Sequence, residues 1–277
     1  MSLTFPGPAI LFCPGNRPER FDNAVAASDV VILDLEDAVP FASKQAARAE
    51  VISACERLGD HVVVRVNAVG TPWHDDDVRA LRELGEATGV LRPIMLPKAE
   101  KIAGLRGLAD FEIFAICESA AGVINAGALA EEPNCAAMLW GAEDLIASLG
   151  GRSSRSPAGN YYRVIEQARA NILFAAAAAG KLAVDAVYTD ISDLAGLAAE
   201  SAEAADLGFC AKICIHPTQS AVVRTAFAPT AERLAWATGV LTEAERSGSA
   251  VFSYQGQMID APLFAQAQAI LRSARSI

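Results

Sequence analysis

The chain has 277 residues, a common length for a single α/β barrel, and 52% of them are hydrophobic, enough to bury one large core. With 23 basic and 33 acidic residues the formal net charge is −10, so most of the surface repels the phosphate backbone of a nucleic acid. We therefore expect no nucleic-acid binding.

The six cysteines indicate a reducing environment, because they occur mostly inside apolar runs and form no CxxC pair. No apolar stretch free of charge and proline reaches the length of a transmembrane helix, and the start of the chain lacks the basic segment of a signal peptide. We expect a cytoplasmic protein without membrane association.

Short apolar runs alternate with longer amphipathic stretches along the chain, which is typical of repeated βα units. The predicted strands span residues 9–13, 30–35, 61–66, 91–96, 111–117, 135–140, 183–188 and 211–215. The predicted helices span residues 17–27, 42–58, 75–86, 99–108, 119–130, 142–149 with 158–179, 192–206, 217–226, 231–248 and 262–277. Eight strands in this alternation predict an α/β fold, a TIM (β/α)8 barrel with extra C-terminal helices, in a single domain over residues 1–277.

Local signals support several of these elements. Ser43 and the Ser192-Asp193 pair precede helical stretches and are predicted N-caps, since their side-chain oxygens can accept from free amides of the first turn. Residues 150–160, rich in Gly and Ser, are predicted to form a mobile flap beside the active site.

Residues suited to chemistry follow the predicted strands. They are Pro14; Asp34, Glu36 and Asp37; Arg65 and Asn67; Lys98; Glu118; Glu143 and Asp144; Asp185 and Asp190; and His216. All strands of a parallel barrel point the same way, so residues at their C-terminal ends meet on the face where barrel enzymes keep their active sites. The pattern predicts an active site drawn from eight segments.

Glu118 and Asp144 follow consecutive predicted strands. Neighbouring strands lie about 4.8 Å apart, so two carboxylates at the same depth can share one divalent ion. Mg²⁺ suits such a pair, because it takes oxygen ligands and keeps several waters. The alternative is that one of the two acids caps the helix that follows it.

Arg65 alternates with valines in HVVVRVN and shares a strand face with Val63 and Asn67. If that face is the barrel interior, the guanidinium needs an anion, and its planar fork matches a substrate carboxylate. The alternative is an internal ion pair with Glu36 or Asp37, and both can hold together.

Other polar residues near the strand ends have simpler explanations. Lys44 and Arg48 are expected to be ordinary helix-surface charges, at least in part. His216 is favoured as a structural hydrogen-bonding residue over a general acid. Lys98 could form a Schiff base only if its pKa were depressed, and nothing beside it in the sequence argues for that.

Motifs across nearly the whole chain resemble the citrate lyase β-subunit-like family, within the aldolase and lyase superfamily that includes malyl-CoA lyases. They are ILFCPGNRPERF, VVILDLEDAVP, VVRVN, IMLPKAE, ICESAAGV, GAEDLIASLG, GFCAKICIHPTQ and GQMIDAPLFAQAQAIL. The resemblance implies a TIM barrel, a homotrimer or hexamer, Mg²⁺, and cleavage or formation of a C–C bond in a 3-hydroxyacyl-CoA thioester.

The resemblance also implies roles for particular residues. Glu118 and Asp144 would be the metal ligands. Arg65 would hold the substrate and stabilise the enolate, beside an acidic wall of Glu36 and Asp37. The general base stays unassigned, because relatives can draw groups from a neighbouring subunit or a C-terminal lid.

The sequence departs from the family pattern where basic residues usually bind CoA, since it has Pro8 and Ala9 before LFCPG and Asn23-Ala24 near the first helix. Arg17 and Arg20, with Lys98, are the candidate substrate and CoA-binding residues. The flap arginines Arg152 and Arg155 could substitute for them.

These observations predict a Mg²⁺-dependent lyase that acts on a short acyl-CoA such as malyl-, citramalyl- or citryl-CoA and gives a 2-oxo acid and acetyl-CoA. The alternatives are an aldolase for free 4-hydroxy-2-oxo acids and a non-catalytic subunit or metabolite-binding protein of the same fold. Whether other lyase subunits are partners is left open.

Overall fold

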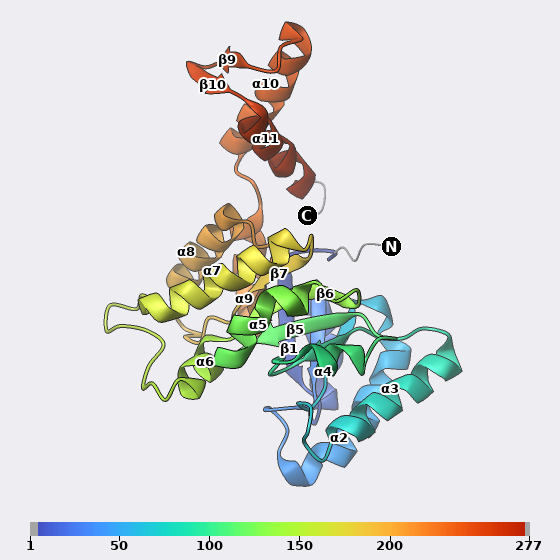
Figure 1. Cartoon of the computed structure of the whole chain (residues 1–277). Helices are drawn as coiled ribbons and strands as arrows, with labels where there is room; N and C mark the ends of the chain where they lie inside the picture. The colour runs from blue at the N-terminus through green and yellow to red at the C-terminus, as the bar shows by residue number, and fades with distance from the viewer. Residues whose placement is uncertain (1–4, 275–277) are drawn as a thin grey trace.

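A computed structural model describes residues 5–274, and eight of its strands close into one barrel in chain order (Figure 1). All neighbouring pairs are parallel, including β1 with β8. The strands are β1 Ala9–Pro14, β2 Val30–Asp34, β3 Val62–Arg65, β4 Ile94–Leu96, β5 Ile113–Cys117, β6 Cys135–Trp140, β7 Leu182–Asp185 and β8 Ala211–Cys214. The predicted TIM barrel is confirmed.

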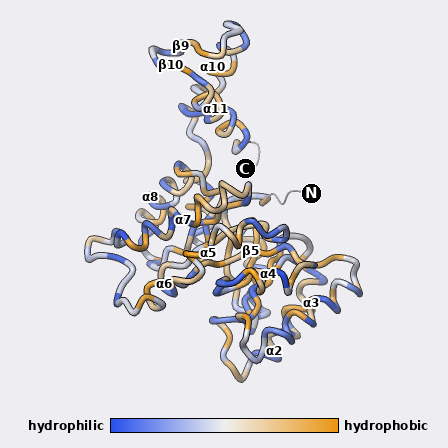
Figure 2. Tube along the Cα trace, in the orientation of Figure 1, coloured by the Kyte–Doolittle hydropathy of each residue, from blue (hydrophilic) through white to orange (hydrophobic). Residues whose placement is uncertain are grey.

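Two apolar layers hold the barrel together because side chains alternate along each strand. Ile32 and Val63 belong to a cluster made from the barrel strands alone, which fills the interior. Val31 and Val64 point the other way and pack against the surrounding helices. Figure 2 shows hydrophobic segments gathered in the central strands, with hydrophilic segments along outer helices such as α3.

The helices follow the predicted order, with small shifts at their ends. They are α1 Phe21–Ala27, α2 Lys44–Arg57, α3 His74–Thr88, α4 Ile102–Arg106, α5 Ala120–Ala130, α6 Ala142–Ser148, α7 Arg163–Ala178, α8 Leu194–Leu207, α9 Pro217–Phe227, α10 Ala231–Ser247 and α11 Ala261–Ser273. Asp193 caps α8 by accepting from the Gly196 amide, as predicted. The predicted Ser43 cap is wrong: its side chain makes no capping hydrogen bond, because a 3-10 turn, Phe41–Ser43, leads directly into α2.

The last part of the chain forms an arm that extends away from the barrel (Figure 1). It consists of α10, the hairpin β9 (Phe252–Tyr254) and β10 (Gln257–Ile259), and α11, around a small core of its own. The hairpin was not predicted. Residues 275–277 of the last predicted helix lie outside the described residues.

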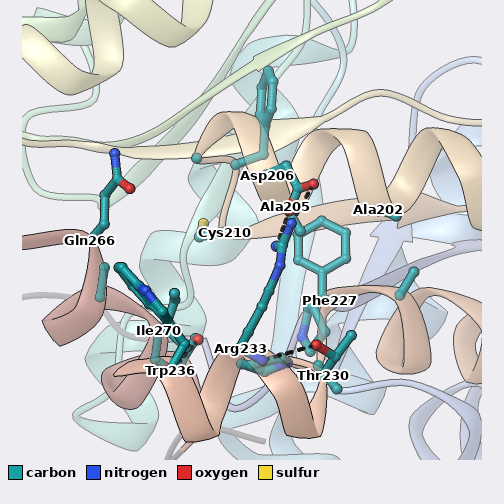
Figure 3. A pocket seen from close by; sticks show the side chains of 18 of the residues that line it. Ala202, Ala205, Asp206, Cys210, Phe227, Thr230, Arg233, Trp236, Gln266 and Ile270 are labelled. Carbon is teal, nitrogen blue, oxygen red and sulfur yellow. Dashed lines mark hydrogen bonds and ion pairs between the residues drawn. The ribbon is translucent and has the colours of Figure 1, made fainter. Parts of the chain in front are cut away.

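A cleft of about 1010 Å³ separates the arm from the N-terminal end of the barrel (Figure 3). Its barrel wall includes Pro8 and Cys210, which precede β1 and β8, and Leu182, the first residue of β7. Arg233 of α10 reaches across it to Asp206 of α8, with Nη2 2.9 Å from Oδ2. The arm therefore lies at the opposite end of the barrel from the strand ends that carry the predicted site. Among the described residues, no helix combines the length and apolar character needed to span a membrane.

Candidate active site

Arg65 and Asp34 form the ordered centre of the candidate site. They end β3 and β2 and are direct neighbours in the sheet. Arg65 donates from Nε and Nη2 to the two oxygens of Asp34, each at 2.7 Å. The guanidinium also lies 4.5 Å from the centre of the Phe12 ring. Burial alone would lower the pKa of Arg65, but the charges of Asp34 and Glu36 hold it above its ordinary value.

Glu36 brings a second carboxylate to Arg65 from the loop after β2. Its Oε1 lies 2.6 Å from Nζ of Lys98, and its Oε2 lies 3.1 Å from Nη1 of Arg65. Oε2 is nevertheless buried without a hydrogen-bond partner, because the approach of Nη1 has poor geometry. Burial raises the pKa of Glu36, against the lowering effect of Arg65 and Lys98. The oxygen therefore contacts Arg65 as an ion pair without a well-formed hydrogen bond.

Lys98 follows β4 with a left-handed backbone, φ 49°, which is uncommon for a residue with a side chain. This conformation turns its amide to Oε1 of Glu118 at 2.9 Å. Its ammonium is 4.0 Å from both Asp37 and Asp144, in addition to the contact with Glu36. Burial alone would lower the pKa of Lys98, but Glu36 raises it above its ordinary value. The depressed pKa that a Schiff-base lysine requires is absent.

Glu118 and Asp144 lie close enough to influence each other electrostatically. Glu118 follows β5 directly and is buried, whereas Asp144 is in the first turn of α6 and is partly exposed. Burial, and then the nearby charge of Asp144, raises the pKa of Glu118 to about 8. A Cβ on Gly141 would lie only 3.0 Å from Oε2 of Glu118, so glycine leaves room for this carboxylate. Two such acids are stable side by side when a cation lies between them.

The donor set fits Mg²⁺ better than a metal that needs a full protein cage. The carboxylates of Glu118 and Asp144 leave places for the waters that Mg²⁺ keeps. Within residues 5–274, no group of three or more His, Cys, Asp or Glu side chains is suited to a metal ion. A hydrated ion with two carboxylate ligands is consistent with that finding.

The structure thus brings Arg65, Glu36, Lys98, Glu118 and Asp144 together at the C-terminal end of the barrel. Asp37 is at the edge of this group: it is 58% exposed and lies 3.8 Å from Nη1 of Arg65. The other predicted binding residues, Arg17 and Arg20, follow β1 on the same face, are exposed, and form ion pairs with Glu19. The internal ion pair expected for Arg65 is present, with Asp34 and Glu36. It is compatible with a second role in binding a substrate carboxylate, because the acids hold the guanidinium in place.

Sequence reasoning missed Asp34 as the main partner of Arg65, and it was wrong about Lys44. Lys44 is only 4% exposed, because its side chain points under the loop that carries Glu36 rather than into solvent. Arg48 is also largely covered and pairs with the buried Asp77 at 2.7 Å. One signal in the sequence could have indicated this role. The DLED run has three acids, and the lysine at the start of the next helix is close enough in sequence to lie beside them.

Some strand-end residues do not belong to the site. Asp185 of β7 faces the helices, where it pairs with Lys212 at 2.7 Å and with Arg169 at 3.0 Å. Because Val184 faces the interior, alternation turns Asp185 outward. His216 caps α9 by accepting from the Thr218 amide, which agrees with its expected structural role.

The segment 150–160 is held by specific contacts. Ser154 is buried and donates to Glu143, the neighbour of Asp144, at 2.6 Å. Arg155 pairs with Glu200 of α8 at 2.7 Å and stacks on Tyr161, with Cζ 3.6 Å from the ring centre. These contacts tie the predicted flap to the barrel beside Asp144.

Comparisons with known proteins agree with this architecture. The HpcH/HpaI aldolase/citrate lyase family matches residues 9–217. A citrate lyase subunit beta-like protein of Mycobacterium tuberculosis is 46% identical over 274 residues, which cover 99% of this chain and 98% of the relative. The mitochondrial citramalyl-CoA lyase of Homo sapiens is 32% identical over 302 residues, which cover 98% of this chain and 86% of that enzyme.

Among solved structures, the CitE protein of Mycobacterium tuberculosis in complex with magnesium, acetoacetate and coenzyme A has a TM-score of 0.90 at 46% identity, covering 97% of this chain and 98% of that one. The matches confirm the family that the sequence motifs indicated, and the lyases among them confirm the predicted class of carbon–carbon lyase. The ligands of that structure include the predicted metal and CoA.

Proposed function

Since the chain belongs to the HpcH/HpaI aldolase/citrate lyase family, we propose that it cleaves or forms the C–C bond of a short 3-hydroxyacyl-CoA thioester with the help of Mg²⁺. Malyl-, citramalyl- or citryl-CoA would give a 2-oxo acid and acetyl-CoA. The main support for this proposal is that the oriented guanidinium of Arg65 and the carboxylates of Glu118 and Asp144 lie on one face of the barrel.

Arg65 is proposed to stabilise the negative charge that develops during the reaction. Breaking the bond beside the thioester leaves the electron pair on an acetyl-CoA enolate, which is the least stable species in the sequence. A cation already fixed in position needs no reorganisation when that charge appears, which is the most effective form of electrostatic catalysis. Asp34 provides the fixation through its two hydrogen bonds. The same guanidinium can hold the substrate carboxylate.

Glu118 and Asp144 are proposed to hold the metal, in keeping with the magnesium in the similar CitE structure. When bound, Mg²⁺ supplies a Lewis acid for the oxygens of the acyl group. Glu36 and Asp37 form the acidic side of the site, beside Nη1 of Arg65.

Arg17 and Arg20 are proposed to contact the phosphates of CoA, with Lys98 nearer the acyl group. Both arginines are about half exposed and lie on the catalytic face, after β1. Their pairing with Glu19 is an exposed surface interaction of small energy, which a phosphate can displace. We also propose a homotrimer or hexamer in the cytoplasm, as the family motifs imply.

A panel of thioesters assayed with and without EDTA tests the proposal. Purified protein is incubated with Mg²⁺ and malyl-, citramalyl- or citryl-CoA, and the 2-oxo acid is trapped. We expect turnover that EDTA abolishes and that Glu118→Gln lacks. Release of 2-oxo acid only from free 4-hydroxy-2-oxo acids would indicate the aldolase instead. Binding without turnover of any substrate would indicate a non-catalytic protein.

A further inference from the structure

Lys44 begins α2 and directs its ammonium into the backbone of the loop that carries Glu36. Its Nζ lies 2.7 Å from the Leu35 carbonyl oxygen, 2.6 Å from the Glu36 carbonyl oxygen and 2.7 Å from Oδ1 of Asn67. An ammonium has three N–H donors, and here each has an acceptor. The geometry is that of a fully satisfied buried cation.

The Asn67 acceptor is itself held in one orientation. Oδ2 of Asp77 accepts from both the backbone amide and the Nδ2 of Asn67, at 3.0 and 2.6 Å, which turns the Asn67 oxygen toward Lys44. Arg48 occupies the other oxygen of Asp77 at 2.7 Å. Asn67 and Asp77 are both buried. Each donor and acceptor in this network therefore has a fixed role. The network ends at the backbone carbonyls of residues 35 and 36.

Glu36 is consequently held on both sides of its Cα. Its amide donates to Oδ1 of Asp34 at 2.8 Å, and its carbonyl accepts from Lys44. The carboxylate that projects from this backbone meets Lys98 at 2.6 Å and Arg65 at 3.1 Å. A displacement of about 1 Å at a reacting centre can cost about 10²-fold in rate.

We infer that Lys44 is a positioning residue of the active site, which sets the backbone of residues 35 and 36 so that the Glu36 carboxylate meets Arg65 and Lys98. The inference rests on the proposed function in that it takes this group of side chains as catalytic. An apolar side chain in place of Lys44 would leave its three buried acceptors, two backbone carbonyls and the amide oxygen of Asn67, without this donor. Two of the three acceptors of Lys44 belong to the catalytic loop.

Lys212 offers a matched control elsewhere in the barrel. It is also fully buried and paired, with Asp185 at 2.7 Å and Glu200 at 3.0 Å, but it lies in the helix-facing layer of β8. Lys212→Met and Lys44→Met each remove one buried ammonium and its contacts, although Asp185 keeps Arg169 and Glu200 keeps Arg155 as partners. Both should lower the melting temperature, so any difference between them in catalysis isolates the positioning effect.

The experiment measures kcat, KM and the melting temperature of the wild type and the two Met variants, with citramalyl-CoA or malyl-CoA and Mg²⁺. We expect Lys44→Met to lower kcat by about 10²-fold with little change in KM, and Lys212→Met to leave kcat per folded molecule unchanged. Should Lys44→Met fail to fold, Lys44→Gln keeps an amide donor and should show a smaller loss of kcat in the same direction. Wild-type kcat in a folded Lys44 variant would overturn the inference.

A crystal structure of the Lys44 variant separates this inference from the proposed function. We expect the contact of 2.6 Å between Glu36 and Lys98 to be broken, and its retention would count against positioning by Lys44. If the wild type cleaves none of the thioesters, the proposed function fails, whereas the positioning inference is still decided by this structure.

Discussion

Arg65 donates to Asp34 from two of its nitrogens, and Asp34 in turn accepts the backbone amides of Glu36 and Ala38, at 2.8 and 3.1 Å. One carboxylate therefore orients both the guanidinium and the loop that follows β2. The remaining nitrogen of Arg65, Nη1, is left for the neighbouring acids of that loop, Glu36 and Asp37. Arg65 and the acidic loop are thus parts of one hydrogen-bonded unit.

Asp34→Asn should lower kcat by about 10²-fold, because an amide can accept only one of the two hydrogen bonds of Arg65 and the guanidinium loses its fixed plane. Arg65→Lys should show a comparable loss, since a lysine cannot form the bidentate contact. Steady-state kinetics with the active thioester measure both effects.

The control for this prediction is Asp110→Asn. Asp110 forms a similar two-point contact with Arg82, at 2.8 and 3.0 Å, but on the exposed surface away from the site. The kcat of the Asp110→Asn variant should equal that of the wild type. Equal activities of the Asp34 and Asp110 variants would show that orientation of Arg65 does not matter.

Mg²⁺ should stabilise the protein more at high pH than at low pH. The pKa of Glu118 is raised to about 8 in the folded metal-free protein, so between its ordinary pKa and about pH 8 the folded state retains a proton that the unfolded chain has released. The stability from this group is therefore present at low pH and lost as the pH rises through about 8. Since a metal requires the ionised carboxylate, Mg²⁺ must displace this proton at low pH.

Melting temperatures with Mg²⁺ and with EDTA, measured at about pH 6 and about pH 9, test this linkage. The increase caused by Mg²⁺ should be larger at the higher pH in the wild type. It should be absent at both values in Glu118→Gln, which cannot ionise at this position. An equal increase in the variant would place the metal elsewhere.

Lys98 should form no covalent adduct with a 2-oxo acid. Although burial alone would lower the pKa of Lys98, Glu36 raises it above its ordinary value, so the amine is protonated and is not a nucleophile at neutral pH. Incubation with pyruvate and borohydride, followed by mass spectrometry, should leave the mass unchanged. A reduced adduct on Lys98 would mean that the chemistry proceeds through an iminium.

Glu200→Gln should loosen the segment 150–160, because Arg155 would lose its ionic partner on α8. Hydrogen exchange of the amides in that segment should become faster than in the wild type. Glu203→Gln is the matched control, since Glu203 lies on the same helix but pairs with Arg169. The same exchange rates in both variants would show that other contacts hold the segment.

The sequence was sufficient for the barrel because its strands carry a local signal. Runs such as VVILD and IFAIC are apolar along their whole length, as expected for strands buried on both faces. The hairpin at β9 and β10 escaped prediction because each strand has only 3 residues and is largely exposed on one face. A pattern that short cannot be separated from a loop.

The site was only partly predictable because partner choice depends on tertiary distances. Strand-end position was enough to select Arg65, Glu118 and Asp144, but not to rank Asp34 above Glu36 as the partner of Arg65. That ranking follows from the pairing of Asp34 with Arg65 across adjacent strands. The role of Lys44 depended on whether the first turn of α2 faces the loop or the solvent, which the sequence pattern did not determine.

The position of the arm has a practical consequence for studying the molecule. Since the arm lies beside the residues that precede β1 and β8 and beside the first residue of β7, a bulky label or fusion on α11 is remote from Arg65 and Glu118 of the same chain. Immobilising the protein through that helix should leave the entrance to the barrel of the same chain open. Binding of small acids could then be followed at a surface without blocking the mouth through which they enter.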